Sequence, residues 1–97
     1  MARAMAMIAK DLDAVFFALA NPTRRAIVER LLSAGELNAG EIAQPFRMSN
    51  SAISRHLRVL EEAGIIERRI ERQWRYVHIR REALALAETW FAVQRGD

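Results

Sequence analysis

The chain has 97 residues, 52% of them hydrophobic, which is enough for one small domain with its own core but not for two. The formal net charge is +3 and the sequence pI is about 10.5, so an anionic partner is favoured. The absence of cysteine excludes disulfides, thiolate metal sites and cysteine nucleophiles.

The positive charge is not spread evenly along the chain. Residues 47–81 carry nine basic and four acidic side chains, whereas residues 1–46 carry five of each. Such a local excess is the electrostatic pattern that nucleic acid requires, although an arginine-rich solvated surface is the alternative. No apolar run approaches a membrane span and the N-terminus lacks the parts of a signal peptide, so we expect a cytoplasmic protein without a membrane partner.

The first predicted helix covers residues 4–20. One of its faces carries an apolar stripe at helical spacing, formed by Ile8, Leu12, Val15, Phe16 and Leu19. From Ala14 to Ala20 the helix is apolar on every side, which is more than one small core can bury. We therefore expect this helix to be either central or shared with a partner.

A second helix is predicted to start at Asn21 and Pro22, since asparagine is a good N-cap and proline suits the first helical position. Gly35 predicts its end. Arg24 and Arg25 lie near its N-terminus, where the helix dipole disfavours cations. These two arginines are either solvated charges or contacts to phosphate.

Residues 39–63 are predicted to form a helix-turn-helix. Asn38 and Glu41 have the spacing of a capping box that starts a short helix. Ser49 is a good N-cap for a longer helix, which Gly64 ends. This longer helix has one apolar stripe and, opposite it, hydroxyls and guanidiniums; the stripe consists of Ile53, Leu57 and Leu60. Such a helix can lie in the major groove of DNA and contact base edges.

After this motif the hydrophobic period becomes that of β-strands, and residues 65–80 are predicted to form a β-hairpin. Its tip lies between Glu71 and Trp74 and lacks the glycine that a tight turn favours. The hairpin carries four arginines, Arg68, Arg69, Arg72 and Arg75. A basic hairpin beside a helix-turn-helix is a wing that can reach the DNA backbone or minor groove. An ordinary small sheet with charged edges is the alternative.

The last predicted helix covers residues 81–95 and has two neighbouring apolar stripes. The first stripe consists of Leu84, Ala87 and Phe91, and the second of Ala83, Leu86, Trp90 and Val93. Because large exposed apolar patches are rare on monomers, we expect the first and last helices to form a dimer interface. A two-fold dimer would contact two half-sites about one helical turn of DNA apart. The predicted fold is mainly α, with five helices and a two-stranded wing, as a homodimer.

Three segments resemble the ArsR/SmtB family of bacterial winged-helix repressors. They are Asn21–Val28, Glu41–Ala43 and Ser51–Ile66, and the resemblance extends over roughly residues 9–92. The resemblance implies a homodimer built on the first and last helices. It also implies repression by occupation of a palindromic operator, often in the protein's own promoter.

The departures from the family pattern concern metal binding. Where arsenic and lead sensors of the family have a Cys-x-Cys pair, this chain has Asn38 and Gly40. Where zinc and nickel sensors have ligands on the last helix, this chain has Glu82 and Glu88 but no histidine there. We therefore expect no metal and no cofactor, as in the cysteine-free, autorepressor-like branch of the family.

We assign the predicted contacts as follows. Base edges would be contacted from the first two turns of the second helix by Asn50, Ser51, Ser54 and Arg55. The DNA backbone would be contacted by Arg47, Ser49, His56, Arg58, Arg72, Gln73 and Arg75. The dimer interface would be formed by Leu12, Val15, Phe16, Leu84, Ala87, Trp90 and Phe91. Ser51 alternatively supports the helix start, and His56 alternatively packs locally.

The leading hypothesis is a sequence-specific regulator of transcription, most simply a repressor, that binds double-stranded DNA. One alternative is a winged helix used only for docking to proteins, because fold alone does not settle function. Another is a repressor that responds to a small apolar molecule held near Phe16, Phe17, Trp90 and Phe91. An enzyme is not expected, since the chain has no nucleophile–base arrangement and no glycine-rich phosphate loop.

Overall fold

The computed structural model describes the backbone of residues 2–97 and the side chains from residue 11 onward. Within these residues there are five helices and three strands. In chain order they are α1 (Ala2–Leu19), α2 (Pro22–Ala34), β1 (Glu36–Asn38), α3 (Ala39–Ala43), α4 (Asn50–Glu62), β2 (Ile66–Glu71), β3 (Trp74–Ile79) and α5 (Arg81–Arg95). The prediction of five helices and a hairpin wing is confirmed. The side chain of Ile8, assigned above to the first apolar stripe, lies outside the described side chains.

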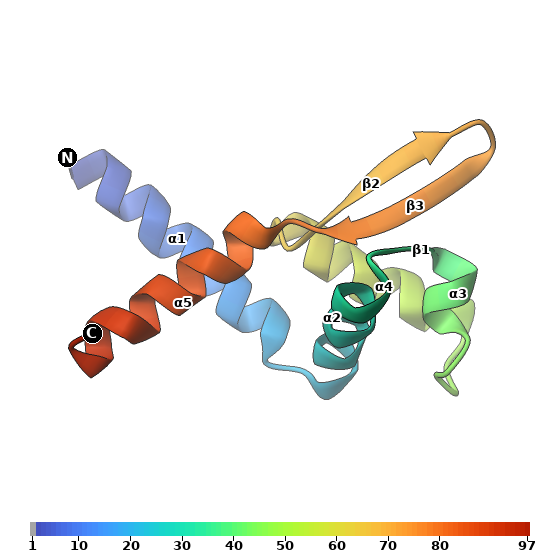
Figure 1. Ribbon diagram of the computed structural model, residues 1–97, viewed down its shortest axis with the longest axis horizontal. Helices are drawn as coiled ribbons and strands as arrows, with labels where there is room; N and C mark the ends of the chain where they lie inside the picture. Colours follow the sequence, from blue (N-terminus) through green and yellow to red (C-terminus); the bar gives the residue numbers. More distant parts are fainter. Residues whose placement is uncertain (1) are drawn as a thin grey trace.

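The molecule is elongated, with extents of 42 × 27 × 22 Å. Helices α1 and α5 cross at one end, where both termini lie, and the β2–β3 hairpin projects near α3 and α4 at the other (Figure 1). None of the helices in the described part of the chain is long and apolar enough to cross a membrane.

The helix ends follow local capping chemistry. The side chain of Asn21 accepts a hydrogen bond of 3.0 Å from the backbone N–H of Arg24, and Pro22 occupies the first position of α2. Asn38 and Glu41 form the predicted capping box of α3, with hydrogen bonds of 2.9 and 3.0 Å. The first turns of α2 and α3 are thus set by residues close by in the sequence.

Helix α4 begins and ends as predicted. The hydroxyl oxygen of Ser49 accepts from the backbone N–H of Ala52 at 3.1 Å. Gly64 follows the helix with φ of 76°, a left-handed conformation that glycine adopts without the steric cost of a Cβ. The recognition helix, as α4 is called from here on, therefore has both termini specified by local signals.

The sheet has one strand more than the sequence predicted. Its order is β1-β3-β2, and all pairs are antiparallel. β2 and β3 form the wing, whose two-residue tip is Arg72 and Gln73, between the paired residues Glu71 and Trp74. β1 pairs with the other edge of β3, with Leu37 opposite Val77. A three-residue strand is too short to show the alternation by which strands are predicted.

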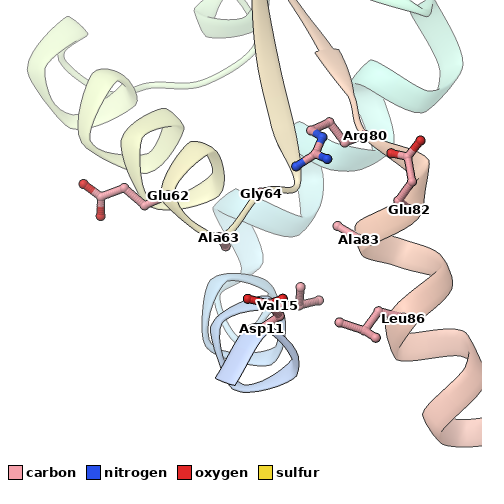
Figure 2. A pocket seen from close by; sticks show the side chains of 9 residues that line it. All are labelled: Asp11, Val15, Glu62, Ala63, Gly64, Arg80, Glu82, Ala83 and Leu86. Atoms are coloured by element: carbon pink, nitrogen blue, oxygen red, sulfur yellow. The ribbon is translucent and has the colours of Figure 1, made fainter. Parts of the chain in front are cut away.

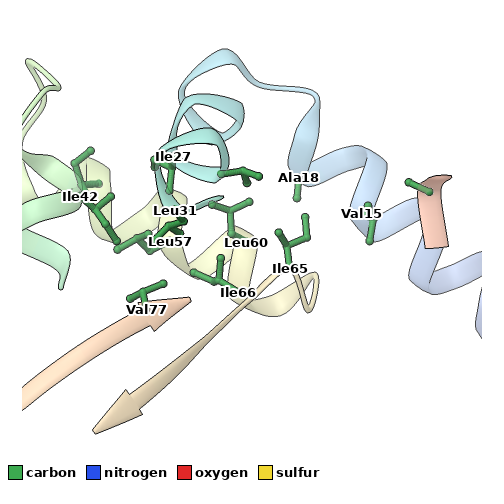
Figure 3. Close-up of a cluster of buried hydrophobic side chains, with 13 residues drawn as sticks. Val15, Ala18, Ile27, Leu31, Ile42, Leu57, Leu60, Ile65, Ile66 and Val77 are labelled. Carbon is green, nitrogen blue, oxygen red and sulfur yellow. The ribbon is translucent and has the colours of Figure 1, made fainter. Parts of the chain in front are cut away.

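The core lies between α1, α2, α3, α4 and the root of the sheet (Figure 3). Its largest fully buried side chains come from all of these parts and are Val15, Ile27, Leu31, Ile42, Leu57, Leu60, Ile65, Ile66 and Val77. Burial of one such aliphatic side chain stabilises the fold by about 1.5–3 kcal/mol. The recognition helix is therefore held by packing along its whole inner face.

Candidate nucleic-acid interface

The recognition helix presents opposite faces to the core and to the solvent. Ile53, Leu57 and Leu60 are 2%, 1% and 0% exposed, as the predicted apolar stripe requires. Exposed side chains cover the other face, and they are those of Asn50, Ser51, Ser54, Arg55 and Arg58. These same five residues line one open hollow on the surface. The structure thus brings together all four predicted base-contacting residues and one predicted backbone contact.

The arginines differ in whether their guanidiniums already bond to other side chains of the protein. Arg68 donates to Glu61 at 2.9 Å, and Arg69 donates to Glu36 at 2.8 Å and to Glu71 at 2.7 Å. The bonds to Glu36 and Glu71 raise the pKa of Arg69. The hydrogen bond from Arg69 is in turn the main reason that the pKa of Glu36 is lowered. Within the described residues, no ion pair or hydrogen bond occupies the side chains of the remaining candidates, Arg47, Arg55, Arg58, Arg72 and Arg75.

The wing tip has a strained backbone. Arg72 has φ of 58°, and it is the one non-glycine residue with positive φ in the described part of the chain. Left-handed backbone costs an ordinary residue roughly 1–2 kcal/mol. Arg72, Gln73 and Arg75 are all exposed there. The sequence pattern did not point to the apolar side chains beside them, Ile70 and Trp74, which are 67% and 50% exposed.

His56 is half-buried and has a partner within the protein. Its Nδ1 lies 3.3 Å from Nη1 of Arg24. Burial, and then the charges of Arg24 and Arg55, lower the pKa of His56. His56 therefore packs against Arg24 through Nδ1, while among the described residues no hydrogen bond involves its Nε2.

Arg24 and Arg25 have bonding partners within the protein that neither interpretation included. Nε of Arg24 donates to the carbonyl of Ala18 at 2.6 Å, and Nη1 of Arg25 donates to that of Leu19 at 2.9 Å. Carbonyls at the end of a helix lack partners within the helix and carry the negative end of its dipole. Both arginines thus close the C-terminus of α1, which periodicity along the sequence cannot indicate.

The predicted dimer residues lie together where α1 crosses α5. Phe16, Trp90 and Phe91 form an edge-to-face cluster with ring centroids 5.3–5.7 Å apart. Trp90 is 42% and Phe91 51% exposed, and Leu12, Phe16 and Leu84 are half-buried. Val15 and Ala87 are buried within the chain itself and support this surface from beneath. Phe17 and Val93 are also strongly exposed; neither is among the seven residues assigned to the interface, although Val93 belongs to the second apolar stripe predicted for the last helix.

A cavity of about 280 Å³ lies between α1, the end of α4 and the start of α5 (Figure 2). Its apolar floor is Val15, Ala83 and Leu86, and charged groups surround it, namely Asp11, Glu62, Arg80 and Glu82. It is separate from the aromatic cluster, where we considered an apolar ligand. Among the described residues, no three histidine, aspartate or glutamate side chains lie close enough to hold a metal ion.

Comparison with known proteins agrees with this geometry. Residues 19–69 match a family described as a helix-turn-helix domain. The chain is 35% identical over 85 residues to the transcriptional repressor SdpR of Bacillus subtilis strain 168. This match covers 86% of this chain and 93% of the repressor.

Solved structures extend the likeness to the whole fold. The crystal structure of an ArsR family transcriptional regulator has a TM-score of 0.83 and 35% identity, covering 91% of this chain and 90% of that one. A homodimeric winged helix-turn-helix DNA-binding domain of Mycobacterium bovis, in a possible ArsR-family regulator, has a TM-score of 0.74 and 26% identity. That match covers 95% of this chain and 86% of the other.

The anchored recognition helix, its exposed polar face and the adjoining wing define a winged helix-turn-helix DNA-binding protein. The matches narrow this class further. The chain belongs to the ArsR family of transcriptional regulators, and it regulates transcription rather than catalysing a reaction.

Proposed function

We propose that the protein is a transcriptional repressor that binds, as a homodimer and without a metal, a palindromic operator in double-stranded DNA. The observation that carries this proposal is the single hollow lined by Asn50, Ser51, Ser54, Arg55 and Arg58 on the exposed face of the recognition helix. A regulator of this kind would act in the cytoplasm, on the nucleoid.

Base recognition is assigned to the first two turns of the recognition helix. Arg55 can donate two hydrogen bonds to O6 and N7 of a guanine. Asn50 can pair with an adenine edge, and the hydroxyls of Ser51 and Ser54 can bond either kind of base. Hydroxyl contacts are individually weak, so the shape of the operator would contribute to specificity.

Backbone contacts are assigned to residues around that helix and on the wing. Phosphates would be held by Arg47, Ser49, His56, Arg58, Arg72, Gln73 and Arg75. The arginines in this set have guanidiniums that no described residue of the protein occupies, which leaves them available to phosphate. Ser49 caps α4 by accepting through its hydroxyl oxygen, so its hydroxyl proton remains available to donate to a phosphate.

Dimerisation is assigned to α1 and α5, through Leu12, Phe16, Leu84, Trp90 and Phe91 over the buried Val15 and Ala87. The exposed rings of Trp90 and Phe91 support this assignment, since aromatic side chains dominate interface energetics. The related domain of Mycobacterium bovis is homodimeric. Two-fold symmetry in the protein would require a palindromic operator.

The absence of a metal requirement is inferred from the donor set. The side chain of Asn38 is already engaged in the capping box of α3, and Gly40 offers no side chain. Glu82 and Glu88 on α5 have no histidine beside them on that helix. The proposed repressor would therefore bind DNA in the presence of a chelator.

Titration of a fluorescent duplex that carries the protein's own upstream region tests the proposal. A scrambled duplex is the comparison, with several salt concentrations, and Arg55→Ala is set against Arg95→Ala, which removes the same charge from the end of α5. We expect preference for the native duplex, weakening with salt, and a loss of about 10–100-fold for Arg55→Ala alone. A folded dimer that binds neither duplex at low salt would refute the proposal and favour a protein-docking module.

A further inference from the structure

The C-terminus of α1 is connected to the recognition helix through one side chain of α2. The guanidinium of Arg24 donates to two carbonyls of α1, from Nε to Ala18 at 2.6 Å and from Nη2 to Phe17 at 3.3 Å. Its third nitrogen, Nη1, lies 3.3 Å from Nδ1 of His56 on the recognition helix. The guanidinium carbon also lies 5.6 Å from the centre of the Phe17 ring. One planar group thus contacts α1 and α4 at once.

Only arginine has the geometry for this connection. Its five N–H donors lie in one rigid plane, so bonds made on one edge set the direction of the other. The neighbouring Arg25 makes a similar bond to the end of α1, to the carbonyl of Leu19, but none to the recognition helix. The chain therefore contains a matched pair of arginines, of which one reaches α4.

The proton on His56 decides whether the connection exists. Arginine can only donate, so Nδ1 of His56 must be the acceptor and carry no proton. The charged groups that act on the ring are Arg24 from α2 and Arg55 from its own helix, both cations. The connected state thus has a neutral imidazole, one residue away from Arg55, to which we assign a base contact.

We propose that Arg24 is a positioning residue that sets the direction of the recognition helix relative to α1, and with it the separation of the two recognition helices in the dimer. This inference rests on the proposed function, since α1 is the helix assigned to dimerisation. A dimer with rigidly placed recognition helices accepts one half-site separation. A dimer in which Arg24 is lost would accept a wider range of separations.

The test is a series of duplexes in which the two operator half-sites are moved apart or together by one and two base pairs. Wild type, Arg24→Ala and Arg25→Ala are titrated against each duplex, after sedimentation has confirmed dimers and circular dichroism the fold. Wild type and Arg25→Ala should bind the native duplex on the order of tenfold more tightly than the duplexes with altered separation. Arg24→Ala should bind the native duplex more weakly and the altered duplexes about as well as wild type does.

A second set of variants separates positioning from direct phosphate contact. A lost phosphate contact would lower affinity equally at every separation. It would also reduce the salt slope, which is the steepness with which log affinity falls with log salt concentration, by about one. A lost positioning contact leaves that slope unchanged. Arg24→Lys, which keeps the charge without the planar fork, should behave as Arg24→Ala. The double variant Arg24→Ala/His56→Leu should show the same preference for half-site separation as Arg24→Ala alone, since both changes break the same contact.

The outcomes distinguish the two proposals. If wild type does not bind the native duplex preferentially, the proposed function fails. If wild type shows a spacing preference and Arg24→Ala retains it in full, the proposed function stands and the role of Arg24 is overturned. That role is overturned as well if Arg25→Ala reduces the preference equally, because Arg25 makes no hydrogen bond to the described residues of the recognition helix.

Discussion

At the scale of single residues, the arginines of this chain divide by what their guanidiniums contact. Arg24 and Arg30 donate to backbone carbonyls, and Arg68 and Arg69 donate to carboxylates. Arginines of these two groups hold the fold together and have little free capacity for a ligand. The basic segment that stands out in the sequence therefore overstates the charge available to DNA. Within residues 47–81, the arginines without a bonded partner among the described residues lie on α4, in the turn before it, at and beside the wing tip and, as Arg81, at the start of α5.

The wing tip allows stability and binding to be separated at Arg72. Arg72→Gly should raise the free energy of unfolding by up to about 1 kcal/mol, because glycine adopts positive φ without strain. The same change should weaken DNA binding and reduce the salt slope by about one, because the phosphate contact proposed for Arg72 would be lost. Urea unfolding and salt-dependent titration measure the two effects. Gln73→Gly is the control, since Gln73 has no positive φ to relieve; equal stabilisation by both would refute the argument.

The pH dependence of stability should report the neutral state of His56. Folding lowers the pKa of His56 from its ordinary 6.5, first through burial of the ring and then through the charges of Arg24 and Arg55, so the folded state favours the neutral ring. The stability linked to this neutral ring is complete above pH 6.5 and is lost as the pH falls through the lower folded pKa. Urea unfolding at pH 7.5 and about 5.5 should therefore show a larger loss for wild type than for His56→Asn, which does not titrate.

The control for that measurement is His78→Asn. His78, on β3, is the other histidine of the chain, and it lies 2.9 Å from Glu67 and 3.4 Å from Glu36 rather than beside Arg24. If both variants lowered the acid loss alike, the pH dependence would not arise from His56.

At the scale of elements, the short α3 and the long α4 depend on different forces. α3 has only five residues and is held by its capping box and the burial of Ile42. α4 has thirteen residues, an N-cap at Ser49 and three buried side chains. A five-residue helix is not stable alone, so it takes its position from the helices that it packs against. The recognition helix is consequently the better defined of the two in its start, end and direction.

Ser49 tests the start of the recognition helix. Ser49→Ala should destabilise the protein by about 1 kcal/mol, because the N–H of Ala52 loses its acceptor. Ser49→Asp should keep the stability, since aspartate is an equally good N-cap and favours the positive end of the dipole. Its added negative charge should nevertheless weaken DNA binding. If Ser49→Asp bound DNA as tightly as wild type, the N-terminus of α4 would lie away from the phosphates.

The wing is held at its root rather than at its tip. Arg69 of β2 reaches across β3 to Glu36 of β1 and stacks on Tyr76, 4.9 Å from its ring centre. The tip beyond has exposed side chains and the strained Arg72. A held root with an exposed tip suits the contact with the DNA backbone that we propose for the wing. β1 therefore serves the wing as a third strand that fixes its base.

At the scale of the whole molecule, the crossed helices and the recognition surface lie at different ends (Figure 1). The aromatic cluster of Phe16, Trp90 and Phe91 is only partly covered within one chain. The polar face of α4 and the wing are separated from it along the long axis. This arrangement permits two chains to join at one end while each contacts DNA with the other.

Phe91→Glu should convert the dimer into a monomer. A buried carboxylate without a partner is strongly unfavourable, so the charge would oppose association of the two chains. Sedimentation should show the halved mass, and affinity for a palindromic operator should fall on the order of a hundredfold because the two half-sites are no longer bound together. Thr89→Glu adds the same charge at an exposed neighbouring position of α5 and should remain dimeric. A dimeric Phe91→Glu would place the interface elsewhere.

The sequence by itself determined the elements whose signals are local. The caps at Asn21, Asn38 and Ser49, the stop at Gly64 and the stripe of α4 each depend on residues within a few positions of one another. Local hydrogen bonds and helical periodicity are set by neighbours in the chain, so they can be inferred without a fold. The same signals identified the exposed face of α4, because the residues opposite a buried stripe must face solvent.

Only the tertiary structure decided which charged residues are occupied and which apolar residues are covered. Arg69 and Glu36 are 33 positions apart, and Arg24 and His56 are 32 apart. No periodicity links such residues, because their meeting depends on how helices and strands pack. The third strand, the left-handed Arg72 and the burial of Val15 and Ala87 beneath the crossing of α1 and α5 share this cause. Each results from contacts between elements, which local sequence does not specify.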